Sequence, residues 1–184
     1  EKKAEKGKGL SNFDFDYFLT KKDGGAYLIA EQYYITTHTY TDSNGNTNTR
    51  TVYHYNDVIV VSVGKTGDIE WVRKVPKNSA ASSGYYLSYG LNFNDNTNEL
   101  NLFFNDNPKN IELLKNNPNK VRRVGSLKKS VAILVSLNEE GNMSRSPMFS
   151  AKDLDKIILK PTMSLRTSDT DVITYAVKGK SYKF

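Results

Sequence analysis

The sequence contains no cysteine, a single tryptophan and only two histidines among its 184 residues. Without cysteine, the chain can form neither disulfide bonds nor thiolate metal sites. It also lacks any apolar run approaching the roughly 20 residues that a membrane-spanning helix requires. The chain opens at Glu1 without an initiator methionine or an apolar signal segment, so we expect a processed form or a fragment.

The net positive charge of the chain comes from two segments. The net charge is +6, and residues 107–129 alone carry seven Lys or Arg residues against Glu112. Residues 1–10 add four lysines against two glutamates, and we predict that they form a flexible tail or linker before a single domain at 11–184. One basic loop and one basic tail do not make a nucleic-acid-binding face.

The residue types that are abundant favour β-structure. Tyrosine, threonine, asparagine and aspartate suit strands and tight turns, and Phe13, Phe15 and Tyr17 alternate with polar residues as in a half-buried strand. Residues 58–61 and 131–135 are instead continuously apolar, and such strands need cover on both faces. The sequence shows no long amphipathic helix that could provide this cover, so we expect stacked β-sheets.

Two stretches of the sequence align without a gap at an offset of 74 residues. Residues 23–30 align with 97–104, residues 60–63 with 134–137, and Gly67 with Gly141. Such a period predicts a repeat architecture. The predicted units are unit one at 13–76, unit two at 85–150 and a partial unit three at 157–184.

The predicted fold is therefore all-β, with antiparallel four-stranded repeat units stacked propeller-like. About two and a half units are present, which is too few to close a ring without further strands. An open terminal sheet invites strand addition by another chain. We accordingly expect self-association through open sheet edges.

Residues 33–55 and 107–129 are insertions at the same junction of units one and two, where function in repeat scaffolds tends to lie. We predict that the first forms a long hairpin around a type I′ turn at Asn44-Gly45. This register pairs His38 with Thr51, Thr36 with Tyr53 and Tyr34 with Tyr55. It creates one tyrosine-rich face, made of Tyr34, His38, Tyr40, Tyr53 and Tyr55.

The tyrosine-rich face is the first candidate binding surface. Tyrosine offers a large contact area at low entropic cost, so this face suits a protein, a peptide or a glycan. The alternative is that cross-strand Tyr–Thr pairs only stabilise the ribbon. The second candidate surface is the basic loop, through Arg122 and Arg123, for an acidic partner; the alternative there is a solvated loop. This loop also contains a short helical pattern at 111–115, but no aromatics that could stack on nucleic-acid bases.

The sequence predicts no metal site, no cofactor and no catalytic residue. In the predicted register His38 and His54 lie on opposite faces of the ribbon, and the calcium-like string that begins at Asp42 has Tyr53 where an acid is needed. No nucleophile elbow, phosphate loop or Ser/His/Asp arrangement is present. The alternative class is a carbohydrate-active hydrolase that uses carboxylates near strand ends. The candidates are Glu31, Asp57, Glu70 and Asp106.

One unit of the sequence resembles a bacterial β-propeller repeat. Its parts are a Gly-Gly strand at residues 23–30, an Asn-Asp apolar strand at 56–61 and a Gly-x-Ile-x-Trp strand at 67–71. Unit two keeps the apolar positions and Gly141 but lacks the Gly-Gly and the tryptophan. The resemblance implies a secreted, periplasmic or surface-associated bacterial protein, and its pattern contains only turn and core positions. We therefore expect a non-catalytic binding or scaffold module of a cell-envelope or secreted protein.

Overall fold

The computed structural model describes residues 11–150, 152, 157–178 and 181–183, so the predicted tail at 1–10 lies outside the described residues. The strands form three antiparallel sheets, which confirms the all-β prediction. The alternating segment at residues 13–20 and the continuous apolar runs thus both become strands.

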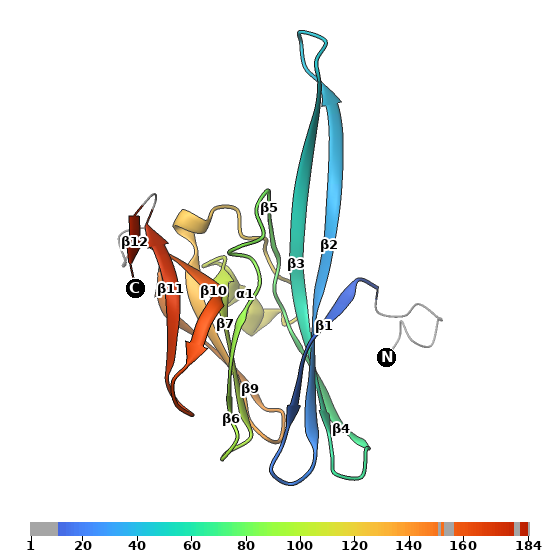
Figure 1. Ribbon diagram of the computed structural model, residues 1–184, viewed down its shortest axis with the longest axis vertical. Helices are drawn as coiled ribbons and strands as arrows, with labels where there is room; N and C mark the ends of the chain where they lie inside the picture. Colours follow the sequence, from blue (N-terminus) through green and yellow to red (C-terminus); the bar gives the residue numbers. More distant parts are fainter. Residues whose placement is uncertain (1–10, 151, 153–156, 179–180, 184) are drawn as a thin grey trace.

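Sheet A has the strand order β1-β2-β3-β4, and the short β5 also pairs with β3. Its strands are β1 (Phe13–Thr20), β2 (Ala26–Thr41), β3 (Thr47–Val63), β4 (Ile69–Val75) and β5 (Ser79–Ala81). Figure 1 shows β2 and β3 extending well beyond their neighbours as a projecting two-stranded ribbon. The first insertion is therefore a long hairpin, as predicted.

Sheet B has the order β6-β7-β8-β9, and sheet C the order β10-β11-β12. The strands of sheet B are β6 (Gly90–Asn94), β7 (Glu99–Asp106), β8 (Val131–Leu137) and β9 (Met143–Ser150). Those of sheet C are β10 (Ile158–Arg166), β11 (Val172–Lys178) and β12 (Ser181–Lys183). The second insertion, between β7 and β8, holds α1 (Asn110–Asn116) and the 3-10 helix η1 (Leu127–Lys129), so the predicted short helix is confirmed.

The central strands of sheets A and B pair in the same register. Ile29 of β2 pairs with Val60 of β3, while Phe103 of β7 pairs with Leu134 of β8, each 74 residues later. All pairs made by residues 26–31 of β2 have such counterparts at 100–105 of β7. The offset in the sequence is therefore also an offset in strand pairing.

The main core lies between sheets A and B, and each sheet contributes a different face to it. Sheet A contributes Tyr27, Ile29, Val58 and Val60, and sheet B contributes Leu100, Leu102, Phe104, Ile133 and Val135. The opposite face of sheet B is turned toward sheet C, where Asn105 Nδ2 donates to the Leu159 carbonyl at 2.9 Å. Sheet B thus lies between the other two sheets (Figure 1).

Four hairpin turns share one geometry, a type I turn followed by a left-handed glycine. In the ribbon, Gly45 N donates to Asp42 O at 3.1 Å and Asp42 N donates to Asn46 O at 2.9 Å. Gly24, Gly45, Gly67 and Gly141 all have positive φ, between 74° and 92°. Because Asn44 is not in the left-handed region, the predicted type I′ turn is wrong. The loop is one residue longer than predicted, which shifts the ribbon register by one residue.

Candidate functional site

The register shift divides the predicted tyrosine-rich face between the two faces of the ribbon. Tyr34 pairs with His54, His38 with Arg50, and Tyr33 with Tyr55. Directly paired residues share a face, and successive residues alternate. Tyr34, His38 and Tyr40 therefore lie on one face, while Tyr53 and Tyr55 lie on the other, so the prediction of a single face is wrong. His38 and His54, predicted to lie on opposite faces, share one.

On the Tyr53 side of the ribbon lies a cavity of about 730 Å³, which we call the tyrosine cavity. Pairing of β5 with β3 brings the connection after Ala81 back against the Tyr55 ring. The backbone approaches closely at Gly84, where a Cβ would lie 3.2 Å from the Tyr55 ring, a tight contact. The residues that line the cavity are Tyr53, Tyr55, Ser82, Ser83, Gly84, Tyr85, Ser88 and Thr162.

The wall formed by Tyr55 is held in place from several sides. Its ring lies 4.7 Å from that of Tyr33, and Lys77 Nζ donates to the Tyr55 carbonyl at 3.1 Å. Burial, followed by the neighbouring Tyr33 and Glu31, raises the pKa of Tyr55 to about 12. The Tyr55 hydroxyl is therefore protonated at neutral pH. Tyr85 is 73% exposed, and the Lys160 ammonium lies 5.7 Å from the centroid of its ring.

The other face of the ribbon holds a pocket of about 430 Å³, which we call the histidine pocket. The Tyr34 ring stacks on the His54 imidazole at a centroid distance of 4.4 Å, and Thr36 Oγ1 lies 2.9 Å from His54 Nε2. Burial, followed by the charge of Arg123 and by His38, lowers the pKa of His54. The residues that line the pocket are Thr36, His38, Tyr40, Arg50, Val52, His54 and Arg123.

Arg123 reaches this pocket from the second insertion, because the backbone beside it docks on sheet A. Val124 is buried, and its N–H donates to Asn78 O at 3.0 Å. The Arg123 Nη2 donates to the Ala80 carbonyl at 3.0 Å. The two surfaces that the sequence analysis treated separately thus meet at Arg123. Arg122 and Arg123 are both exposed, but only Arg123 lines the pocket.

Each carboxylate considered for hydrolysis is paired with a cation. Glu31 Oε1 lies 2.7 Å from Lys77 Nζ, with both side chains buried, and Asp106 pairs with Arg145. Asp57 lies 3.4 Å from Lys74, and Glu70 lies 2.7 Å from Lys21. Because Glu31 and Glu70 are held by their lysine partners, their carboxylates are less available to bind a substrate. Burial also raises the pKa of Glu31.

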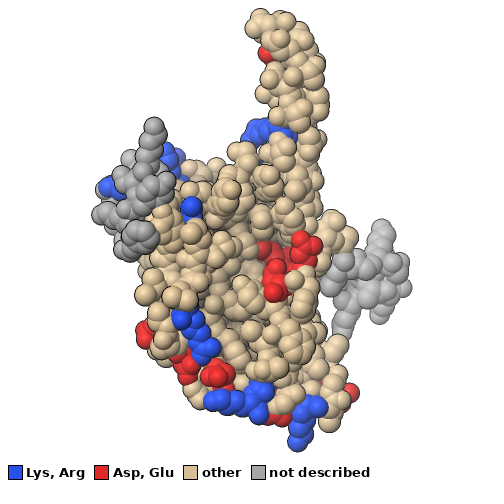
Figure 2. Space-filling model, viewed as in Figure 1, with Lys and Arg blue, Asp and Glu red and all other residues tan. Residues whose placement is uncertain are grey.

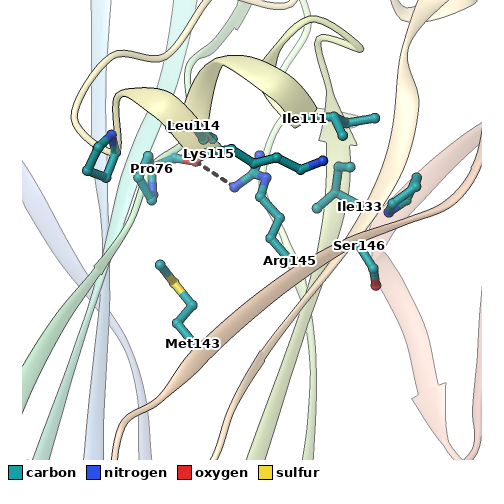
Figure 3. Close-up of a pocket in the computed structure, with 10 residues that line it drawn as sticks. Pro76, Ile111, Leu114, Lys115, Ile133, Met143, Arg145 and Ser146 are labelled. Carbon is teal, nitrogen blue, oxygen red and sulfur yellow. Dashed lines mark hydrogen bonds between the residues drawn. The ribbon is translucent and has the colours of Figure 1, made fainter.

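A third cavity, of about 240 Å³, lies beneath α1 and is mainly apolar (Figure 3). Ile111 and Leu114 of α1 line it together with Pro76 and Met143. The Arg145 side chain extends into it and donates to the Pro76 carbonyl at 3.1 Å. Arg145 also pairs with Asp106, although its buried Nε has no hydrogen-bond partner. We interpret this mainly apolar cavity as part of the packing of α1.

Comparisons with known proteins leave the sites to be interpreted from their own geometry. No known protein family matches this chain, and neither does any curated protein or solved structure. In the described part of the chain, no helix is long and apolar enough to cross a membrane. The described residues also contain no cluster of three or more His, Asp or Glu side chains suited to a metal ion.

Proposed function

We propose that this chain is a non-catalytic binding module whose tyrosine cavity holds a neutral glycan. The observation that carries the proposal is the lining of that cavity, which combines tyrosine rings with serine and threonine hydroxyls and contains no charged side chain. Aromatic faces with a few convergent hydroxyls provide contact area and adaptable hydrogen bonds, as binding sites rich in Tyr, Ser and Gly do.

The scaffold of this module is, in our proposal, a propeller-like stack of repeat units. Two observations support the stack: sheets A and B pair in the same register, and each contributes a different face to the core between them. Sheet A turns Tyr27 and Ile29 toward sheet B, and sheet B turns the equivalent residues, Asn101 and Phe103, away from sheet A. The setting proposed for the module, a bacterial cell envelope or secreted protein, follows from the sequence resemblance alone.

A carbohydrate-active hydrolase has less support from this geometry. A glycosidase needs two carboxyl groups that flank the scissile bond, one of them able to donate a proton. Glu31 is only 2% exposed and accepts hydrogen bonds from Lys77 and Ser88. Asp106 is fully buried in its pair with Arg145. A binding role requires none of these groups to leave its partner.

The proposal is tested by titrating the protein with neutral oligosaccharides of glucose, mannose, galactose and N-acetylglucosamine in a calorimeter. We expect saturable binding of at least one of them, weakened about tenfold or more by Tyr85→Ala or Tyr53→Ala, because each removes an aromatic wall. Tyr40→Ala, which removes an exposed tyrosine from the opposite face, serves as the matched control and should leave affinity unchanged.

Three results would contradict the proposal. The first is the absence of saturable binding to every sugar tested. The second is binding that is insensitive to both cavity substitutions. The third is turnover of a glycan that disappears in Glu31→Gln or Asp57→Asn, which would instead establish the hydrolase.

A further inference from the structure

The histidine pocket gathers positive charge without a compensating acid. Its ionisable side chains are His38, Arg50, His54, Arg123 and the hydroxyl-bearing Tyr40, and none of the lining residues is Asp or Glu. Within the described residues, neither Arg50 nor Arg123 belongs to a salt bridge. Figure 2 shows basic side chains on the flank of the ribbon, below its tip. Like charges held together in this way are stabilised by a bound anion.

The pocket is built by three segments that fix its groups from different sides. His38 and Arg50 are directly paired across β2 and β3, so their side chains project from the same face. The Tyr34 ring and Thr36 hold the His54 imidazole in one orientation. Arg123, which lines the pocket, is anchored by the hydrogen bond from its Nη2 to Ala80 O, and its guanidinium group carries further N–H donors.

We propose that the histidine pocket binds a tetrahedral oxyanion, a phosphate or sulfate group. Arginine guanidinium groups present planar forks of N–H donors that match the oxygens of such anions. The His38 imidazole and the Tyr40 hydroxyl supply further donors around the same space, beside the hydrogen bond between Thr36 and His54. At about 430 Å³ the pocket also has room for the organic part of an ester that carries the anion. This site is independent of the tyrosine cavity, since the two lie on opposite faces of the ribbon.

The charge of the pocket gives the binding a pH dependence. His54 faces His38 and Arg50 on the ribbon and Arg123 from the second insertion. Burial and the neighbouring positive charge lower the pKa of His54, and a bound anion favours its protonated form, so binding should tighten on acidification. Sulfate keeps its charge between pH 7.5 and 5.5, so any tightening of sulfate binding over this range reports protonation of the pocket rather than of the ligand.

The experiment follows the ring signals of His38 and His54 by NMR while sodium phosphate, or sodium sulfate, replaces sodium chloride at constant ionic strength. We expect saturable shifts of both rings, and tighter sulfate binding at pH 5.5 than at pH 7.5. Arg123→Gln and Arg50→Gln should each weaken binding about tenfold or more. Arg122→Gln removes the same charge from the neighbouring exposed residue and should leave affinity unchanged.

Shifts that do not saturate, or that are equal in Arg123→Gln and Arg122→Gln, would overturn the proposal in favour of non-specific electrostatics. Shifts produced by phosphate but not by sulfate would assign the pocket to phosphate groups, and the reverse to sulfate groups. Tyr85→Ala should weaken glycan binding but leave the oxyanion affinity unchanged. The glycan proposal and the oxyanion proposal can therefore fail independently.

Discussion

At the scale of single residues, the most consequential feature is a buried ion pair. Glu31 and Lys77 are 2% and 1% exposed, and their charged atoms lie 2.7 Å apart. Burial raises the pKa of Glu31 and lowers that of Lys77. Their mutual contact opposes both shifts, and the hydrogen bond from the Ser88 hydroxyl opposes that of Glu31. The sequence analysis selected Glu31 as a carboxylate near a predicted strand end, whereas Glu31 lies within β2 (Ala26–Thr41). The sequence contained no local signal for Lys77 as its partner, because their contact depends on the folding of β2 against the chain after β4.

Removing one member of this pair should destabilise the protein strongly. Glu31→Gln or Lys77→Met leaves the other charge buried without its partner, and we expect each to cost about 3–5 kcal/mol of unfolding free energy. The double variant should cost much less than the sum of the two. Urea denaturation at neutral pH measures all three values.

The exposed pair Glu112–Lys115, whose side chains are 74% and 66% exposed, is the control. Glu112→Gln should change stability by less than about 0.5 kcal/mol. Single substitutions at the buried pair that cost no more than this control would show that the pair is solvated in solution.

At the scale of elements, strands were predictable and the register of the ribbon was not. The alternation at Phe13–Thr20 and the apolar runs in β3 and β8 gave correct strands, because side-chain period follows directly from strand geometry. The Asn44-Gly45 dipeptide favoured a type I′ turn. The Asp42 carboxylate instead accepts hydrogen bonds from the backbone N–H groups of Asn44 and Asn46, each at 2.9 Å, and stabilises the longer loop.

The register error carried over to the binding sites. A glycine at the fourth position of all four turns was the signal that could have corrected it. With the right register, sequence alone would have separated Tyr34 from Tyr55. It would not have placed Arg123 beside His54 or Ser82–Ser88 beside Tyr55, because both depend on contacts between distant segments.

Two of these turn glycines differ in surroundings, which allows a matched prediction. A Cβ at Gly45 meets nothing within 4 Å, whereas a Cβ at Gly141 would lie 2.7 Å from the Trp71 ring. Both glycines have positive φ, so Gly45→Ala should cost about 1 kcal/mol through backbone strain alone. Gly141→Ala should cost at least about 1 kcal/mol more because of the clash.

Chemical denaturation with tryptophan fluorescence as the signal compares the two variants. Equal costs would mean that Trp71 does not pack on the turn of sheet B. The hydrogen bond from Trp71 Nε1 to Glu139 O, at 2.8 Å, argues that it does.

At the scale of the whole molecule, the outer face of sheet A is apolar and uncovered by the described part of the chain. Phe15, Phe18, Ile69 and Val72 on this face are between 50% and 66% exposed. They surround Leu28 and Val61, whose counterparts in sheet B, Leu102 and Val135, are buried against sheet A. Sheet A thus covers this face of sheet B, whereas no sheet in the described part of the chain covers the equivalent face of sheet A.

The far side of sheet C offers a complementary apolar surface. Leu165 and Ile173 are paired there and are 67% and 63% exposed. We predict that sheet C of one molecule covers the outer face of sheet A of a second copy, in a head-to-tail contact that repeats the stacking within the chain. Contiguous exposed apolar patches of this kind mark interaction surfaces.

The measurement that tests the central claim, a stack of equivalent sheets with an open end face, is sedimentation velocity over a wide range of protein concentration. The wild-type chain should associate as its concentration rises. Phe18→Ser combined with Val72→Ser should shift it toward monomer without loss of folded structure, while Tyr40→Ser on the ribbon should not. A wild-type chain that remains monomeric at every concentration, or one whose association ignores the Phe18 and Val72 substitutions, would contradict the account.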